Sequence, residues 1–402
     1  MTSWVRSLSG RAFRRGKGLV GSLVLAAAAR HRRRLASVTF VGVTGSCGKT
    51  TTKDLIVAVL ASRLPGTANI KSYNSLRWII LTLLATRPRH RFCVQEIGAS
   101  GPNSIGKSVG LVRPEIAVVT NVGPDHHKAF RTLEATAAEK MRLVAALSPG
   151  GTALLNADDP YVLSMRERCA GRVLTYGTSE TADLRALGVR SAWPGRLSFT
   201  AVHAGERVPL ETRLCGEHWA PCVLAALGVG LAFGIPLTES ARVLARVEPR
   251  PGRMSPLEAE GVTFVRDDWK APLWSIPPAL AFLRSAAATR KIAVIGTLSD
   301  YAGSNEKKYA AVAREALAAA DHVVFAGRWS RGALRAGSGE SGTLHVFDEV
   351  EQAARWLRGF LQPGDLVLLK GSLTVDRLER VIRAWTRATP RAGTPLGRRA
   401  ES

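Results

Sequence analysis

Short apolar runs alternate with helical patterns along most of this chain. Residues 38–43 (VTFVGV), 91–97 (RFCVQEI), 116–122 (IAVVTNV) and 152–157 (TALLNA) are rich in β-branched residues, and most end near polar or acidic ones. Continuous apolar runs of this length are typical of buried parallel strands. We therefore predict an α/β region in which the C-terminal ends of the strands carry a site.

A second α/β series follows a helix predicted over 222–234. Its strands are expected at 291–296, 322–327 and 365–371, with alanine-rich helices between them. The Pro/Gly/Arg segment around 247–254 is typical of a hinge. We predict a basic helical segment (1–37), a central domain with a mostly parallel sheet (38–246), a C-terminal Rossmann-like α/β domain (247–388) and a disordered tail (389–402).

Charge is concentrated near the start of the chain. The formal net charge is +24, and residues 1–36 contain nine arginines and lysines and no acidic residue. Such a segment could contact an anionic membrane surface, attract an acidic polymer, or reflect an arginine-rich composition without a specific role. The apolar run at 18–29 is shorter than the ~20 residues that span a bilayer, so we expect a helix that packs on the first domain.

The cysteines bear on the cellular compartment. Five cysteines are scattered along the chain, an odd number without metal-ligand spacing. This pattern favours reduced thiols over a disulfide framework. We expect a cytoplasmic protein, with peripheral contact at the inner face of the membrane left open.

A glycine-rich stretch, VGVTGSCGKTTTK (41–53), carries the clearest chemistry. It lies between the first predicted strand and a helix expected to begin near Lys49. Backbone N–H groups and a helix N-terminus converge in such a loop and favour an anion. Lys49 would reach the terminal phosphates of a nucleotide, and the Thr50 hydroxyl would ligate Mg²⁺. The sequence thus predicts a P-loop central domain, although its glycines lie at 42, 45 and 48 rather than at the usual spacing.

Three further residues are candidates for the same site. Glu96 ends the strand at 91–97, where a second Mg²⁺ ligand is expected, and His126 follows the next strand. Lys140 lies in an amphipathic helix after it. Taken alone, Lys140 is typical of a solvated surface charge.

Together these motifs resemble the Mur ligase family. The resemblance runs from about residue 38 to about 385 and rests on several motifs in the family's order. They are the glycines of the loop, EIGAS (96–100), TNVGPDHH (120–127), TLEATAAEK (132–140), LNADDP (155–160), GEH (216–218), PGRM (251–254), VRDDWKAP (265–272) and VLLKGSLTVDRLERV (367–381). It is strongest toward the branch that adds D-alanyl-D-alanine, although DDWKAP is more similar to the D-glutamate-adding branch.

The resemblance implies ATP-dependent amide ligation. A substrate carboxylate attacks the γ-phosphate to give an acyl phosphate and ADP, and an amine then attacks the acyl carbon. It implies two Mg²⁺ ions, the first held by Thr50 and Glu96 and the second by His126. Lys140 matches a lysine that CO₂ converts to a carbamate, which would position the second ion.

It also implies nucleotide and substrate contacts. The loop residues expected at the phosphates are Gly45, Ser46, Cys47, Gly48, Lys49, Thr50 and Thr51. In the C-terminal domain, Arg253 matches an arginine that reaches the γ-phosphate, Asp268 a residue that holds the ribose, and Lys270 a lysine near the phosphates. Lys370 and Ser372 lie where the incoming amine is held.

Three departures suggest a changed substrate. About 37 residues precede the first strand, too few for the domain that binds UDP in relatives with UDP-linked substrates. Trp219 follows His218 where the family has asparagine, and could stack on the adenine, while Cys222 replaces a second asparagine. Tyr73 and Asn74 are kept, but neighbouring substrate-facing positions differ.

Two function classes remain. The first is an ATP-dependent ligase of a carboxylate and an amine or amino acid. The alternative is a nucleotide-binding regulatory or scaffold subunit of a cell-envelope or polymer-synthesis complex, which the altered adenine motif favours and the full set of metal and phosphate residues opposes. Specific nucleic-acid binding is not predicted, because no recognition helix or aromatic-basic sheet motif is present.

Overall fold

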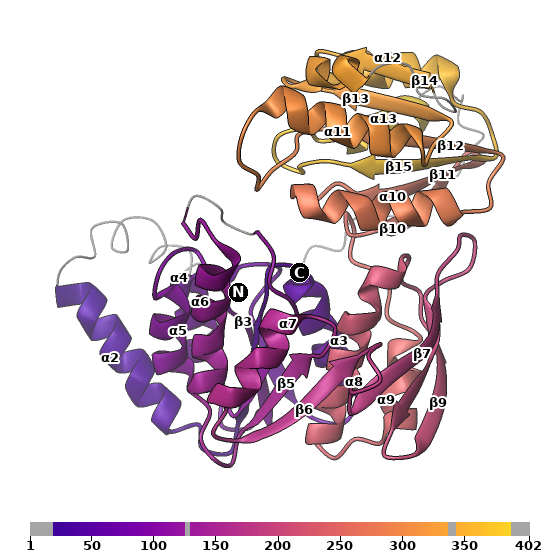
Figure 1. The fold of residues 1–402 in the computed structure, drawn as a ribbon. Coiled ribbons are helices and arrows are strands. Elements are labelled where there is room, and N and C mark those ends of the chain that lie inside the picture. The colour runs from indigo at the N-terminus through magenta and orange to yellow at the C-terminus, as the bar shows by residue number, and fades with distance from the viewer. Residues whose placement is uncertain (1–18, 125–128, 337–342, 387–402) are drawn as a thin grey trace. The chain divides into compact units, whose positions relative to one another are not determined.

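The computed structural model describes residues 19–124, 129–336 and 343–386. The exposure of side chains is described from residue 23 onward. The chain divides into two compact units (Figure 1). The first extends to Glu248, apart from residues 191–195 and 214–216. Those two short segments belong to the second unit, together with the chain from Pro249.

The first unit is built on a nine-stranded sheet of order β2-β3-β1-β4-β5-β6-β7-β8-β9. The strands from β2 to β7 pair in parallel, and β8 and β9 extend the sheet antiparallel. Their bounds are β1 Thr39–Thr44, β2 Gly66–Ala68, β3 Phe92–Glu96, β4 Ile116–Val119, β5 Thr152–Asn156, β6 Arg172–Gly177, β7 Leu184–Arg190, β8 Ser198–His203 and β9 Glu206–Glu211.

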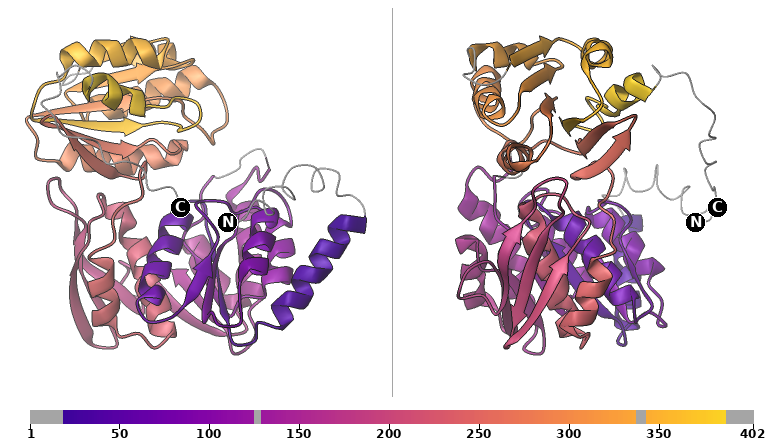
Figure 2. Two further views of the ribbon diagram at one scale, coloured as in Figure 1. Left: turned by 180° about the vertical axis from the view of Figure 1, so that it is seen from behind. Right: turned by 90° about the vertical axis from the view of Figure 1, so that its right-hand side faces the viewer.

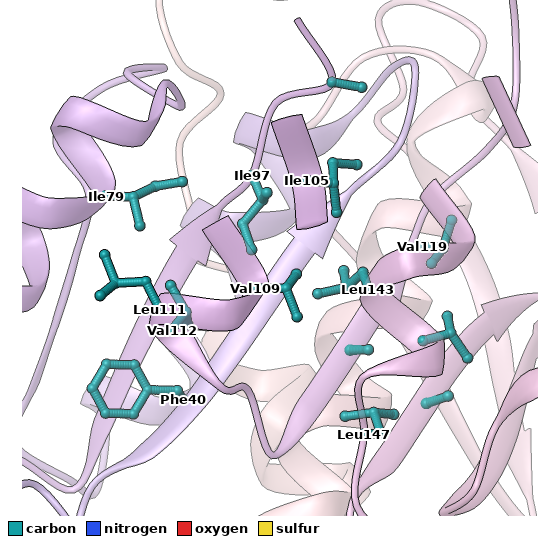
Figure 3. Close-up of a cluster of buried hydrophobic side chains, with 14 of the residues drawn as sticks. Phe40, Ile79, Ile97, Ile105, Val109, Leu111, Val112, Val119, Leu143 and Leu147 are labelled. Carbon is teal, nitrogen blue, oxygen red and sulfur yellow. The ribbon is translucent and has the colours of Figure 1, made fainter. Parts of the chain in front are cut away.

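Helices lie on both faces of this sheet (Figure 2). Their bounds are α2 Leu19–Arg33, α3 Lys49–Ala61, α4 Leu76–Ala85, α5 Ser104–Val112, α6 Leu133–Ala145, α7 Pro160–Leu163, α8 Ala220–Ala232 and α9 Leu237–Leu244, with short 3-10 turns η1 Ser164–Arg168 and η2 Glu217–Trp219. On one face, side chains of α4, α5 and α6 pack with Phe40 and other strand residues to form a buried core (Figure 3). The continuous apolar pattern of β1, β3 and β4 follows from burial on both faces.

The second unit has a six-stranded sheet of order β10-β11-β15-β12-β13-β14, parallel except for β10. The strands are β10 Ser255–Ala259, β11 Val262–Asp267, β12 Arg290–Ile295, β13 His322–Ala326, β14 Thr343–Phe347 and β15 Asp365–Lys370. The helices are η3 Leu273–Ser275, α10 Ile276–Ser285, α11 Asn305–Leu317, η4 Ser330–Ala336, α12 Val350–Phe360 and α13 Glu379–Thr386. Its own core lies between the sheet and helices α12 and α13.

The α/β class predicted from the apolar runs is confirmed, and the seven predicted strands lie at or within a few residues of their expected positions. The helix expected behind the basic start is α2, which packs on α4 and α5. In the described part of the chain, no helix is both long and apolar enough to cross a membrane. The predicted tail, from residue 389, lies outside the described residues.

Candidate active site

The glycine-rich loop joins β1 to α3 as predicted, and two of its glycines are required by geometry. Gly48 caps α3 with φ 74°, and no side chain caps the helix. A Cβ on Gly45 would lie 1.8 Å from Thr120 Oγ1, and one on Gly48 would lie 2.7 Å from Cys222 Sγ. The backbone therefore takes a conformation and a close approach that larger residues disfavour.

Residues of the 120–123 segment hold this loop in place. Thr120 Oγ1 donates to the Cys47 carbonyl at 2.5 Å, while Asn121 Oδ1 accepts from Ser46 N at 3.0 Å and Cys47 N at 2.8 Å. Two of the N–H groups expected to face phosphate thus donate to Asn121. The N-terminus of α3, which begins at Lys49 directly after this loop, presents the positive end of the helix dipole and so favours an anion.

The Lys49 side chain lies over the loop. Its Nζ donates to the carbonyl oxygens of Gly45 at 2.5 Å and Ser46 at 3.1 Å. The side chain is half-buried, so its charge is placed beside the helix N-terminus and within reach of solvent. A lysine here adds to the positive end of the α3 dipole, as a triphosphate site requires.

Thr50, Glu96 and Asn74 form a connected set at the C-terminal edge of the sheet. Thr50 Oγ1 donates to Glu96 Oε2 at 2.8 Å, and Asn74 Nδ2 donates to Glu96 Oε1 at 2.8 Å. Asn69 fixes the glutamate backbone, because its Oδ1 accepts from Glu96 N at 2.8 Å. The adjacent hydroxyl and carboxylate oxygens are the donors that Mg²⁺ prefers, so this pair fits the ion predicted there.

The second predicted metal site is described only in part. His126 lies outside the described residues. Lys140 is fully buried in α6, so its interpretation as a solvated surface charge is wrong. It shares the buried face of that helix with Thr136, Leu143 and Val144. Within the described ranges, no three His, Cys, Asp or Glu side chains group as metal ligands.

Two supporting residues were missed by the sequence analysis, although they lie in the LNADDP motif. Asn156 Nδ2 donates to the Thr120 carbonyl at 2.9 Å, and Asp159 Oδ2 accepts from Val122 N at 2.7 Å. Asp159 also accepts from two N–H groups of α7. These residues fix the segment that in turn holds the phosphate loop.

A cavity of about 320 Å³ lies next to this site in the first unit. Its lining comes from the start of α4, the segment after β3 and helix α5. It includes Ser75, Ser100, Ser104, Ser108 and Lys107. Hydroxyl groups and one exposed lysine suit an anionic or hydrogen-bonding ligand.

The predicted substrate residues lie beside this cavity. Asn74, already bound to Glu96, precedes the lining residue Ser75. Tyr73 is 39% exposed and stacks on Trp78, with ring centroids 4.3 Å apart. The guanidinium of Arg77 lies 5.6 Å from the Trp78 ring. A partly exposed aromatic pair therefore lies within two residues of Ser75 and Leu76, which line the cavity.

The adenine-side residues are more enclosed than expected. Trp219 is 5% exposed, and its ring centroid lies 4.8 Å from that of His218. An adenine could stack on this indole only after the ring or its neighbours moved. Cys222, also buried, contacts the Gly48 carbonyl through Sγ at 3.9 Å.

In the second unit, the PGRM turn packs on the DDWKAP segment. Trp269 N donates to the Gly252 carbonyl at 3.1 Å, and the Arg253 guanidinium lies 5.5 Å from the Trp269 ring. Asp268 is fully buried; its Oδ2 pairs with Arg266 at 3.0 Å. Burial raises the pKa of the Asp268 carboxyl above its ordinary value, and Arg266 opposes the shift. Lys270 pairs with Asp300 at 2.7 Å.

The two residues expected at the incoming amine have internal partners. Lys370 is buried and its Nζ lies 2.5 Å from Asp267 Oδ2, so direct contact with a substrate would require this pair to open. Ser372 N donates to Asp376 Oδ2 at 2.6 Å. Asp376, which was missed, also accepts from Thr297 N at 2.8 Å and Thr297 Oγ1 at 2.6 Å. It joins the loops after β12 and β15.

Two family models match this chain. The Mur ligase middle domain matches residues 43–230, and the Mur ligase, glutamate ligase domain matches residues 252–373. Together they cover most of both units. The matched regions contain the phosphate loop and Glu96 in the first unit and Arg253 and Asp268 in the second.

Individual proteins agree with the family models. UDP-N-acetylmuramoyl-tripeptide–D-alanyl-D-alanine ligase of Mycobacterium leprae is 30% identical over 395 residues, covering 88% of this chain and 76% of that protein. The ligase of the same name from Synechocystis is 30% identical over 353 residues, covering 87% and 74%.

Solved structures show the same fold. A crystal structure of MurF from Acinetobacter baumannii has a TM-score of 0.82 at 22% identity, covering 90% of this chain and 80% of that one. MurF ligase of Thermotoga maritima in complex with ADP has a TM-score of 0.81 at 22% identity, covering 91% and 83%. The relatives are ligases, which supports the first function class over a regulatory or scaffold subunit. The chain belongs to the Mur ligase family and is an ATP-dependent ligase that forms an amide bond between a carboxylate and an amine.

Proposed function

We propose that the protein extends a peptide-bearing cell-envelope precursor, joining its carboxylate to D-alanyl-D-alanine or a similar small amine. The names of the relatives support this substrate class. The observation that carries the proposal is the Thr50–Glu96–Asn74 set, which connects the phosphate loop to the segment bordering the serine-lined cavity. A carboxylate held at this cavity would lie next to the expected position of the terminal phosphate.

In this proposal the chain brings two anions together and keeps them reactive. Lys49 and the first-turn N–H groups of α3 bind the triphosphate and stabilise charge that develops during phosphoryl transfer. The substrate carboxylate attacks the γ-phosphate and ADP leaves. The amine then attacks the acyl carbon of the acyl phosphate, and inorganic phosphate leaves.

Mg²⁺ is proposed at the same site. Thr50 and Glu96 would hold the ion through oxygen atoms that already lie 2.8 Å apart. The ion supplies positive charge that offsets the negative charge of the phosphates. A second ion at His126 stays a proposal for a residue outside the described part of the chain.

Carbamylation of Lys140 is a finer proposal. Its complete burial disfavours the ammonium form, and a neutral amine is the form that reacts with CO₂. The reaction joins the nitrogen of the neutral amine to the carbon of CO₂ and releases one proton, so the neutral side chain becomes an anion. Starting from the ammonium form, two protons are released and a cation becomes an anion. Mass spectrometry of the native protein would detect the added CO₂, although the carbamate reverses on denaturation.

Residues of the second unit are proposed to complete nucleotide binding. The proposed roles are γ-phosphate contact for Arg253, ribose contact for Asp268 and phosphate contact for Lys270. Lys370 and Ser372 are proposed at the amine, with the Lys370–Asp267 pair opening on binding. Stacking of Trp219 on the adenine is also proposed.

We further propose residues 38–246 and 247–388 as the two functional domains, and a cytoplasmic location with residues 1–36 at the inner membrane face.

The test is ADP and phosphate release from the full chain with ATP, Mg²⁺ and bicarbonate. A panel would pair carboxylate peptides with D-alanyl-D-alanine and other amines. Lys49→Ala and Lys140→Ala are expected to lose at least about 100-fold in turnover, because each removes charge stabilisation at the reacting groups. Lys307→Ala, on the exposed side of α11, is the matched control.

The outcomes are distinguishable. Turnover that needs both substrates and falls in both lysine variants but not in the control would support the proposal. ATP binding without turnover across the panel, with Lys140 unmodified in the native mass spectrum, would contradict it.

A further inference from the structure

Six exposed arginines gather where α2 ends and where the chain passes from α4 to β3. They are Arg30, Arg33, Arg34, Arg87, Arg89 and Arg91. The two segments are joined directly, because the His31 ring lies 2.8 Å from the Thr86 carbonyl and Ser37 Oγ donates to the Pro88 carbonyl at 3.2 Å. We call these six residues the arginine patch.

The patch is not neutralised by its surroundings. Residues 19–38 and 84–91 contain no acidic side chain. Within the described part of the chain, the ion pair in this region is that of buried Arg32 with Glu115, and none of the six patch residues forms one. The pKa of the His90 imidazole is lowered, first by burial and then by the positive charges of Arg89 and Arg87. The second effect shows that positive charge accumulates here.

Exposed apolar side chains lie beside this charge. Leu23 and Leu25 on α2 are 60% and 41% exposed, and Leu84 at the end of α4 is 41% exposed. The helix itself is anchored, since Ala28 is buried in the core of the first unit and Val24 packs against it. Figure 1 shows α2 along the outer side of this unit beside α5 and α4.

The patch and the phosphate loop lie at opposite edges of the sheet. Arg34 and Arg91 precede β1 and β3, whereas the loop follows the end of β1. In parallel strands these positions are separated by the strand length. A partner on the patch would therefore leave the loop of the first unit uncovered.

We propose that the arginine patch and the neighbouring leucines dock this protein on the surface of an anionic lipid bilayer. Charge complementarity favours anionic headgroups, and exposed leucines beside arginines suit the boundary between headgroups and acyl chains. A nucleic acid would use the arginines but not the aliphatic side chains, and residues 19–38 and 84–91 contain no Phe, Tyr or Trp to stack on its bases.

The experiment is co-sedimentation of the full chain with vesicles of phosphatidylcholine alone or with about 30% phosphatidylglycerol. Binding is expected only with the anionic vesicles. It should weaken between about 0.1 M and 0.5 M salt, because the Debye length falls below the ~10 Å found at 0.1 M. Arg87→Glu/Arg89→Glu/Arg91→Glu should lower the partition coefficient at least about tenfold.

Two further variants separate the patch from general charge. Arg207→Glu/Arg242→Glu/Arg246→Glu changes the net charge equally at exposed arginines elsewhere in the first unit and should keep binding. Leu23→Ser/Leu25→Ser should reduce vesicle binding while circular dichroism stays unchanged. Each variant is also titrated with a fluorescent 20-mer oligonucleotide.

Three outcomes would overturn the proposal. One is equal loss of vesicle binding in the patch and control variants, which would indicate net charge alone. Another is retained binding in the patch variant, which would show that Arg87, Arg89 and Arg91 do not contact the bilayer. The third is tight, patch-dependent binding of the oligonucleotide with no binding to vesicles.

Discussion

At the residue scale, Arg32 holds α2 on the first unit through several contacts of one side chain. It donates to the carbonyls of Val112 at 2.6 Å and Arg113 at 2.8 Å and pairs with Glu115 at 2.5 Å. Its guanidinium also lies 4.0 Å from the centroid of the Phe40 ring. The other Glu115 oxygen accepts from Phe40 N at 2.7 Å, so the ion pair connects helix and strand.

We expect Arg32→Ala to lower the free energy of unfolding by about 2 kcal/mol. The substitution leaves buried carbonyls without a donor, while the half-exposed Glu115 regains water, which limits the loss. Urea unfolding followed by circular dichroism measures the change. Arg33→Ala, one position along and exposed, should change stability by less than about 0.5 kcal/mol, and equal losses in the two variants would contradict this account.

We expect the charged form of Asp268 to lower the stability of the folded protein, although the same carboxylate is proposed to bind the ribose. Its folded-state pKa is raised by burial, so the folded protein binds the proton more tightly than the unfolded chain does. Stability contributed by the protonated form is full below the ordinary carboxyl pKa and is lost as pH rises through the raised value.

Asp268→Asn should therefore raise the unfolding temperature at pH 7 and weaken ATP binding in the same protein. Thermal unfolding at pH 7 and pH 4 and calorimetric ATP titration would measure both effects. A variant that is destabilised at pH 7 would show that the Arg266 pair outweighs the burial of the charge.

At the scale of elements, the edge strand β14 meets α12 through a cluster of aromatic rings. His345 lies 4.3 Å from Trp356 and 5.7 Å from His322, and His322 lies 4.7 Å from Phe360 between ring centroids. Burial lowers the pKa of both imidazoles. Arg290 also lowers that of His322, whereas Asp321 and Asp365 raise it, and His322 lowers that of His345.

The second unit should consequently lose stability in mild acid. Because the folded-state pKa values lie below 6.5, the unfolded chain takes up protons first as pH falls below about 6.5. His345→Gln should flatten the pH dependence of unfolding between pH 7 and pH 5. His203→Gln, in the first unit, is the control substitution, and an unaltered slope in His345→Gln would contradict the prediction.

How far sequence predicts structure differs among these elements. The continuous apolar runs identified parallel strands because a strand that is buried on both faces needs apolar side chains at nearly every position. Strands β7, β8 and β9 are among those that were missed, since buried and exposed side chains alternate in them, and a glycine interrupts β7 and a proline β9. For Lys140 the signal was available, because its helical spacing from Thr136 and Val144 places it on the buried face. Asp376 gave no such signal, since its partners come from loops far apart in sequence.

At the scale of the whole molecule, each unit has a hydrophobic core of its own. Cooperative unfolding follows the core, so calorimetry should resolve two transitions. Asp376→Ala, which removes three hydrogen bonds from the second unit, should lower only one of them, and Arg32→Ala only the other. A single transition that moves with both variants would show that the units unfold together.

The packing of α2 on the first unit also limits how far this protein can be truncated at its N-terminal end. The family match begins at residue 43, which is 24 residues after α2 begins. An expression clone started at that point would delete four of the six residues of β1 and would uncover the core that Ala28 and Leu35 share with α4 and α5. Such a clone is expected to yield inclusion bodies, whereas one that starts at residue 19 keeps the anchor and should give crystallisable protein.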